Sequence, residues 1–132
     1  MAEDVAMTLG QIYALAPVIA LAGVGAFDKK GRADALWAGV APHDALAPLH
    51  KKVDQALVRI GLEPERRAYL PHITLARLPR AASADPAIEQ WRARHAALSS
   101  EPFAPDALIL YESRLGRDGA SYDPVARFPL VG

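Results

Sequence analysis

The sequence predicts an α+β fold in which a mostly antiparallel sheet is flanked by helices. Apolar segments with strand-like composition occur in two pairs, and each pair is joined by a polar turn that contains glycine. Apolar stripes with helical spacing lie before the first pair and between the two pairs. The chain has 132 residues, 52% of them hydrophobic, and is therefore long enough for a single domain, residues 1–132, with a core of its own.

A helix is predicted at the start of the chain. Glu3 and Asp4 suit its first turn, where acidic side chains oppose the helix dipole. Its apolar face would consist of Val5, Leu9, Ile12, Tyr13 and Ala16. Pro17 is expected to end this helix because proline cannot continue the backbone hydrogen bonds.

A hairpin and a second helix are predicted next. Residues 18–27 and 35–40 are expected to be strands, joined by a polar turn in which Gly31 takes a positive φ. Residues 42–60 predict a helix that Gly61 ends. The apolar stripe of this helix is Leu46, Leu49, Val53, Leu57 and Ile60.

The second half of the chain predicts a strand, a helix and a closing hairpin. Residues 69–78 are rich in β-branched and aromatic side chains and read as a strand. Asp85 and Pro86 suit the start of a short helix. Residues 107–115 and 121–130 are expected to form the final hairpin.

The strand at 69–78 carries the residues most suited to chemistry. Strand side chains alternate between faces, so His72 and Thr74 should project together, roughly 7 Å apart, while Ile73 and Leu75 should face a core. A histidine carries a proton near neutral pH, and a hydroxyl beside it can bind a phosphate oxygen. The pair suits acid–base catalysis on a phosphate ester. The alternative is a half-buried strand whose His and Thr only face solvent.

Composition excludes several classes of function. The net charge is zero and the pI is about 6.9, so there is no global basic field for long nucleic acids, although a short RNA end or a small phosphorylated ligand needs only a local cluster. The absence of cysteine excludes disulfides and thiolate metal sites. No apolar run could span a bilayer, and the acidic start does not resemble a signal peptide. We therefore expect a soluble, cytoplasmic protein.

Other residues have competing interpretations. Arg66 and Arg67 precede the His72 strand and could attract a phosphate or form solvated ion pairs. Trp37 is expected to pack against the sheet. The remaining histidines have no metal-binding spacing and are expected to start a helix or to pack on one: His43, His50 and His95.

Six segments, in their order, resemble the 2H phosphoesterase superfamily, in particular its bacterial 2′-5′ RNA ligase or RNA 2′,3′-cyclic phosphodiesterase family. They are residues 21–27, 36–40, 71–77, 111–115, 119–122 and 127–130. The resemblance covers nearly all of the chain. It implies two lobes, each of which contributes a His-x-Thr strand to a central cleft, with one histidine as general acid and the other as general base. It also implies hydrolysis of a terminal cyclic phosphate of RNA to a 2′-phosphomonoester, with no cofactor.

On this resemblance, His72 and Thr74 match the catalytic residues of the family, with His72 as the general base for water. Arg77 matches the arginine that ends the family motif, which implies substrate binding. Strand parity turns Arg77 away from His72 unless a bulge intervenes, and an ion pair under the sheet is the alternative role.

The chain departs from the family pattern because it has one His-x-Thr motif instead of two. We expect an N-terminally truncated, incomplete version of the two-lobed fold. A homodimer partner or a missing N-terminal segment would then complete the activity. The expected partners are RNA 3′ ends or small cyclic nucleotides. We expect no association with a membrane. The alternatives are a catalytically impaired RNA-end or nucleotide-binding module, and a bare structural fragment.

Overall fold

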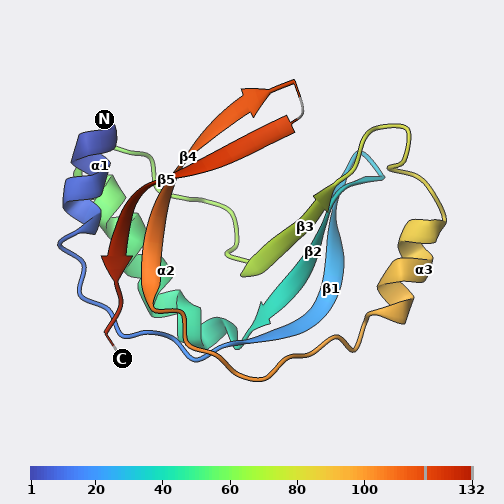
Figure 1. The fold of residues 1–132 in the computed structure, drawn as a ribbon, viewed down its shortest axis with the longest axis horizontal. Coiled ribbons are helices and arrows are strands. Elements are labelled where there is room, and N and C mark those ends of the chain that lie inside the picture. Colours follow the sequence, from blue (N-terminus) through green and yellow to red (C-terminus); the bar gives the residue numbers. More distant parts are fainter. Residues whose placement is uncertain (118, 132) are drawn as a thin grey trace. The chain divides into compact units, whose positions relative to one another are not determined.

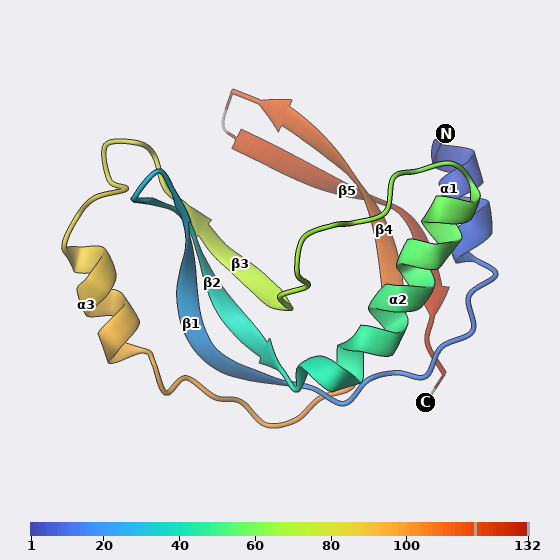
Figure 2. The ribbon, with the colours of Figure 1, turned by 180° about the vertical axis from the view of Figure 1, so that it is seen from behind.

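The computed structural model describes residues 1–117 and 119–131 (Figure 1; Figure 2, from behind). The elements follow the predicted order of helix, hairpin, helix, strand, helix and hairpin, which confirms the α+β class. They are α1 (Ala2–Leu9), β1 (Ala20–Lys29), β2 (Arg32–Ala41), α2 (His43–Arg59), β3 (His72–Arg77), α3 (Ala87–Arg94), β4 (Ala107–Gly116) and β5 (Gly119–Pro129).

The chain divides into two compact units. The first unit comprises Met1–Pro17, Ala47–Arg67 and Ala104–Gly132, and the second comprises Val18–Leu46 and Ala68–Phe103. The strands accordingly form two antiparallel sheets rather than one: a two-stranded sheet, β4-β5, and a three-stranded sheet in the order β1-β2-β3. Among the described residues, none of the helices has both the length and the hydrophobicity needed to cross a membrane.

In the first unit, α1 packs against α2 through small buried residues. The hydroxyl of Thr8 donates a hydrogen bond of 3.3 Å to the backbone carbonyl of Ala56, and both residues are buried. Because a buried hydroxyl without a partner is costly, this bond also fixes where the two helices cross. The β4-β5 hairpin completes the unit, as the sequence predicted.

The prediction that the first helix runs to Pro17 is wrong. The helix ends at Leu9, and Gly10 is its C-cap. Glycine costs a helix about 1 kcal/mol relative to alanine. Beyond it the chain gains a different set of backbone hydrogen bonds: the N–H of Ala16 donates to the carbonyl of Val131, 2.6 Å away, and the N–H of Val131 donates to Ala14. Tertiary pairing therefore replaces the helix that the apolar spacing predicted.

In the second unit, β1 and β2 form the predicted hairpin. Lys30 and Gly31 both have positive φ, 53° and 76°, so the turn has two residues and Gly31 has the predicted role. The buried apolar side chains of this unit are Ile19, Ala33, Ala35, Ala38 and Val40. Residues that follow α3 pair with β1, as in the bridge between Ala22 and Ser99, and β3 is an edge strand on the other side of the three-stranded sheet (Figures 1 and 2).

This edge position explains a second wrong prediction. Ile73 and Leu75 were expected to face a core, yet they are 46% and 53% exposed. Each residue of an edge strand has a neighbouring strand on one side only, so its side chains retain more contact with solvent. The side chains of β3 nevertheless alternate between the two faces of the sheet, and this alternation determines which of them share a face with His72.

Candidate active site on the three-stranded sheet

His72 and Thr74 lie on one face of the β1-β2-β3 sheet. In the antiparallel register, His72 is opposite Gly39 and Thr74 is opposite Trp37. Gly39 and Trp37 are two residues apart on β2, so their partners share a face, as the sequence predicted. Both His72 and Thr74 are exposed, and a phosphate group can therefore reach them.

A hydrogen bond holds the imidazole of His72 in one tautomer. Its Nδ1 lies 2.6 Å from the backbone carbonyl of Leu70. A carbonyl oxygen only accepts, so Nδ1 carries the hydrogen and donates it. In the neutral ring the lone pair then belongs to Nε2, the nitrogen that can take a proton from a reacting water. The backbone around Pro71 thus orients the ring so that Nε2 is its basic nitrogen.

Two aromatic side chains support His72. The ring of Phe27 meets the imidazole edge to face, with centroids 4.8 Å apart and planes at 85°. The Trp37 ring lies 6.2 Å from the imidazole and 5.6 Å from Phe27. Sequence reasoning assigned Trp37 to sheet packing and gave Phe27 no role. The register of the β1-β2 hairpin, combined with the alternation of side chains along each strand, could have located them, because it places Phe27 and Trp37 on the face of His72.

Trp37 occupies its place because its neighbour on β1 has no side chain. Gly25 is directly opposite Trp37, and a Cβ on Gly25 would overlap the indole ring. The indole therefore lies across the backbone of β1. Its Nε1 is buried and has no hydrogen-bond partner within the part of the chain that the structure describes.

Arg77 joins this face through an irregularity in β3. Leu36 pairs with Ala76 and Trp37 with Thr74, so one extra residue, Leu75, is accommodated between these pairs. The register then places Arg77 opposite Ala35, two residues from Trp37 on regularly paired β2. A bulge of this kind reverses the alternation beyond it. Arg77 consequently shares the face of His72 and Thr74, rather than turning away as unbroken parity would require.

Two further candidate residues, Arg66 and Arg67, belong to a different compact unit from His72. Arg66 and Arg67, in the first unit, form exposed ion pairs with Glu63 at 3.8 Å and with Glu65 at 3.6 Å. A hydrogen bond from the backbone N–H of Arg67 lowers the pKa of Glu65 below its ordinary value. Both arginines thus form solvated ion pairs, one of the two alternatives predicted from the sequence.

The remaining histidines behave as the sequence predicted. His43 is the first residue of α2, and His50 is half-buried within that helix. The ring of His95 lies 5.8 Å from that of Trp91 on α3. In residues 1–117 and 119–131, no three His, Cys, Asp or Glu side chains gather closely enough to hold a metal ion.

The chain is similar to known proteins over most of its length. Residues 2–117 match the family model of the 2′-5′ RNA ligase superfamily. An RNA 2′,3′-cyclic phosphodiesterase of Geobacillus stearothermophilus is 30% identical over 114 residues, which cover 86% of this chain and 35% of the relative. One from Aeropyrum pernix is 36% identical over 61 residues, 46% of this chain and 35% of the relative. The chain thus spans about a third of the length of these curated relatives.

Solved structures show the same fold. The crystal structure of Escherichia coli LigT complexed with 3′-AMP superimposes with a TM-score of 0.72 at 21% identity, covering 100% of this chain and 71% of LigT. The match of the family model to most of the chain is independent of this likeness. The chain therefore belongs to the 2′-5′ RNA ligase superfamily of 2H phosphoesterases, as its sequence motifs predicted.

Proposed function

We propose that this chain contributes one acid–base residue, His72, to an RNA 2′,3′-cyclic phosphodiesterase that opens a terminal cyclic phosphate to a 2′-phosphomonoester. The observation that supports this most is the orientation of the imidazole: Nδ1 donates to the carbonyl of Leu70, which leaves Nε2 as the basic nitrogen on an exposed face. Thr74 and Arg77 share that face by register. The curated relatives are named for the same reaction.

In this proposal each group on this face has a role. Nε2 of His72 takes a proton from a water molecule as its oxygen forms a bond to phosphorus. The bond from phosphorus to the 3′ oxygen breaks, and a second acid must protonate that oxygen, which becomes the 3′ hydroxyl. The hydroxyl of Thr74 donates to a phosphoryl oxygen, and the guanidinium of Arg77 offsets the charge that develops there. Each acid–base group contributes about 10²–10⁴ in rate.

The second acid–base residue has no His-x-Thr candidate within this chain. His72 is the only one of the four histidines that is followed two residues later by threonine. We propose that the other histidine comes from a second copy of the chain, in a homodimer that brings two His72 side chains together, or from another segment of a longer protein. A symmetric dimer satisfies this requirement because it repeats the same patch on both subunits.

A second candidate function is a module that binds RNA ends or nucleotides without turnover. It is favoured by the single His-x-Thr motif, since binding needs the phosphate-holding groups but not an acid–base pair. The LigT crystal structure is a complex with 3′-AMP, which supports nucleotides as ligands in this fold.

Hydrolysis of adenosine 2′,3′-cyclic phosphate separates the two functions. Chromatography should identify 2′-AMP as the product, and His72→Ala should lower the rate at least about 10²-fold. His43→Ala is the matched control, because His43 is exposed at the start of α2 and should leave the rate unchanged. Binding of 3′-AMP without any hydrolysis would favour the binding module. Hydrolysis that survives His72→Ala would overturn the assignment of His72.

A further inference from the structure

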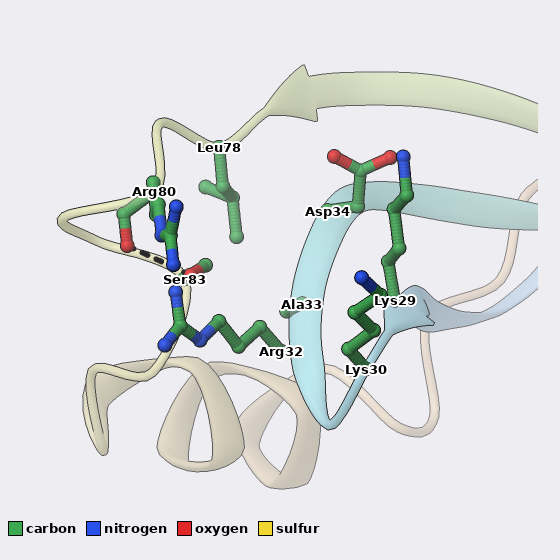
Figure 3. Close-up of a pocket in the computed structure, with 8 residues that line it drawn as sticks. All are labelled: Lys29, Lys30, Arg32, Ala33, Asp34, Leu78, Arg80 and Ser83. Carbon is green, nitrogen blue, oxygen red and sulfur yellow. Dashed lines mark hydrogen bonds between the residues drawn. The ribbon is translucent and has the colours of Figure 1, made fainter.

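A basic pocket lies at the opposite end of β3 from His72 (Figure 3). Its volume is about 400 Å³, and four cationic side chains line it: Lys29, Lys30, Arg32 and Arg80. Asp34 is the one carboxylate in the lining. In Figure 3 the Arg32 side chain reaches toward the loop that holds Arg80 and Ser83. All of these residues belong to the second unit, so the pocket is formed within one compact part of the chain.

Backbone hydrogen bonds fix the walls of this pocket. The N–H of Ala33, beside the hairpin turn, donates to the carbonyl of Ser83 at 2.9 Å, and the N–H of Leu78 donates to the carbonyl of Asp34 at the same distance. The buried hydroxyl of Ser83 donates to the carbonyl of Arg80 at 2.8 Å. The loop after β3 is thereby tied to the β1-β2 hairpin, which gives the cationic side chains a defined frame.

The charges in this pocket are not neutralised by the rest of the described chain. No ion pair within residues 1–117 and 119–131 involves any of the four cations, whereas five arginines elsewhere in those residues do pair with carboxylates. The whole chain has no net charge, so this is a local concentration of positive charge. Guanidinium and ammonium groups that line one cavity suit an anion, and the arginine fork suits phosphate in particular.

The position of the pocket relative to His72 suggests which phosphate it would bind. β3 runs from His72 to Arg77, and Leu78 already lines the pocket. At about 3.3 Å per residue the pocket begins about 20 Å from His72. Arg77 lies between them and shares the face of His72. A nucleic acid strand advances at least about 3.4 Å per nucleotide, so this separation corresponds to at most about six nucleotides.

We propose that the basic pocket binds a backbone phosphodiester of a single-stranded RNA whose 3′ end lies at His72. This inference rests on the proposed function and adds a second subsite to it, upstream on the same substrate. A mononucleotide would occupy only the His72 face. An RNA of about seven or more nucleotides would also reach the pocket and bind more tightly.

Binding measured against RNA length tests this subsite. The probes are a dinucleotide and an octanucleotide that carry the 2′-phosphate product at their 3′ ends, titrated by fluorescence anisotropy. The double variant Arg32→Gln, Arg80→Gln should weaken octanucleotide binding about tenfold, since exposed charge pairs contribute modestly, and leave the dinucleotide unchanged. The dependence of log K on log salt should fall by about 1.4, which corresponds to two lost single-strand phosphate contacts.

The matched control removes the same charge from the same unit. Arg92→Gln with Arg94→Gln alters α3, outside the pocket lining, and should leave the affinity for both RNAs unchanged. Equal affinity of the pocket variant and the unsubstituted chain for the octanucleotide would overturn the subsite. An equal loss of affinity for the dinucleotide and the octanucleotide would also overturn it. So would binding of inorganic phosphate by a chain whose affinity for RNA does not depend on RNA length.

The same experiments distinguish this proposal from the proposed function. If the chain hydrolyses the cyclic mononucleotide and the pocket variant binds the octanucleotide normally, the subsite alone fails. If no cyclic phosphate is hydrolysed but octanucleotide binding depends on Arg32 and Arg80, the subsite holds as a binding site and the proposed function fails.

Discussion

At the residue scale, the proposed chemistry depends on three side chains of one short strand. His72 and Thr74 share a face because they are two residues apart, which the sequence alone predicts. Arg77 shares it for a reason that the sequence does not display. The bulge at Leu75 becomes visible only when β3 is aligned with β2, because it is a property of the pairing and not of either strand alone.

Thr74 offers a test of the phosphate-binding role. Thr74→Val keeps the shape of the side chain and removes the hydroxyl, so the rate of cyclic phosphate hydrolysis should fall about 10²-fold, the usual effect of losing one transition-state donor. Thr74→Ser keeps the hydroxyl and should retain most of the activity. Steady-state kinetics on both variants give the comparison, and equal rates for Val and Ser would contradict the role.

Arg77 tests the consequence of the bulge. If its guanidinium contacts the substrate phosphate, Arg77→Gln should weaken 3′-AMP binding about tenfold, as expected for a charge-assisted hydrogen bond that is partly screened by solvent. The control is Arg92→Gln, which replaces a half-buried arginine paired with Glu89 on α3 and should bind normally. Isothermal titration calorimetry measures both. Unchanged affinity in Arg77→Gln would mean that the side chain is not at the phosphate.

At the element scale, periodicity predicts the order of helices and strands but not all of their limits. The stripe from Leu46 to Ile60 correctly gives α2, a long helix that runs from His43 to Arg59. The apolar stripe that continues past Gly10 does not form a helix. Residues 14 and 16 instead make backbone hydrogen bonds with Val131, which are more favourable there than a further helical turn. The exposure of β3 depends on strand order, which residues within β3 do not specify.

Gly25 provides a prediction about the sheet that carries the site. Gly25→Ala would force the indole of Trp37 off the β1 backbone and should lower the free energy of unfolding by about 1–3 kcal/mol, the cost of overpacking. Urea denaturation followed by tryptophan fluorescence measures this. Gly116→Ala is the matched control, because the added Cβ would make only an ordinary contact with the carbonyl of Gly119. Equal stability of the two variants would show that Gly25 does not position Trp37.

At the scale of the whole molecule, the family could be predicted from the sequence because its motifs occur in order along nearly the whole chain. The division into two compact units and two separate sheets could not, because it depends on which hairpin pairs with which strand. The aromatic support around His72 has the same origin, since Phe27 and Trp37 meet the imidazole only through the β1-β2-β3 register.

The single His-x-Thr motif leads to a prediction about assembly. If a second copy supplies the other histidine, specific activity should rise with protein concentration over the range in which sedimentation shows dimer formation. Adding an excess of the His72→Ala chain should then reduce the activity of the unsubstituted chain by forming mixed dimers. Activity that is independent of concentration in a stable monomer would exclude completion by a second copy.

The central claim is that the face of His72 receives the phosphate, and imidazole nitrogen NMR tests it most directly. In a titration with 3′-AMP, the ring nitrogens of His72 should shift, with Nδ1 protonated by its bond to Leu70 in the neutral ring, while His43 and His95 remain unchanged. A saturating shift at another histidine with His72 unaffected would contradict the account.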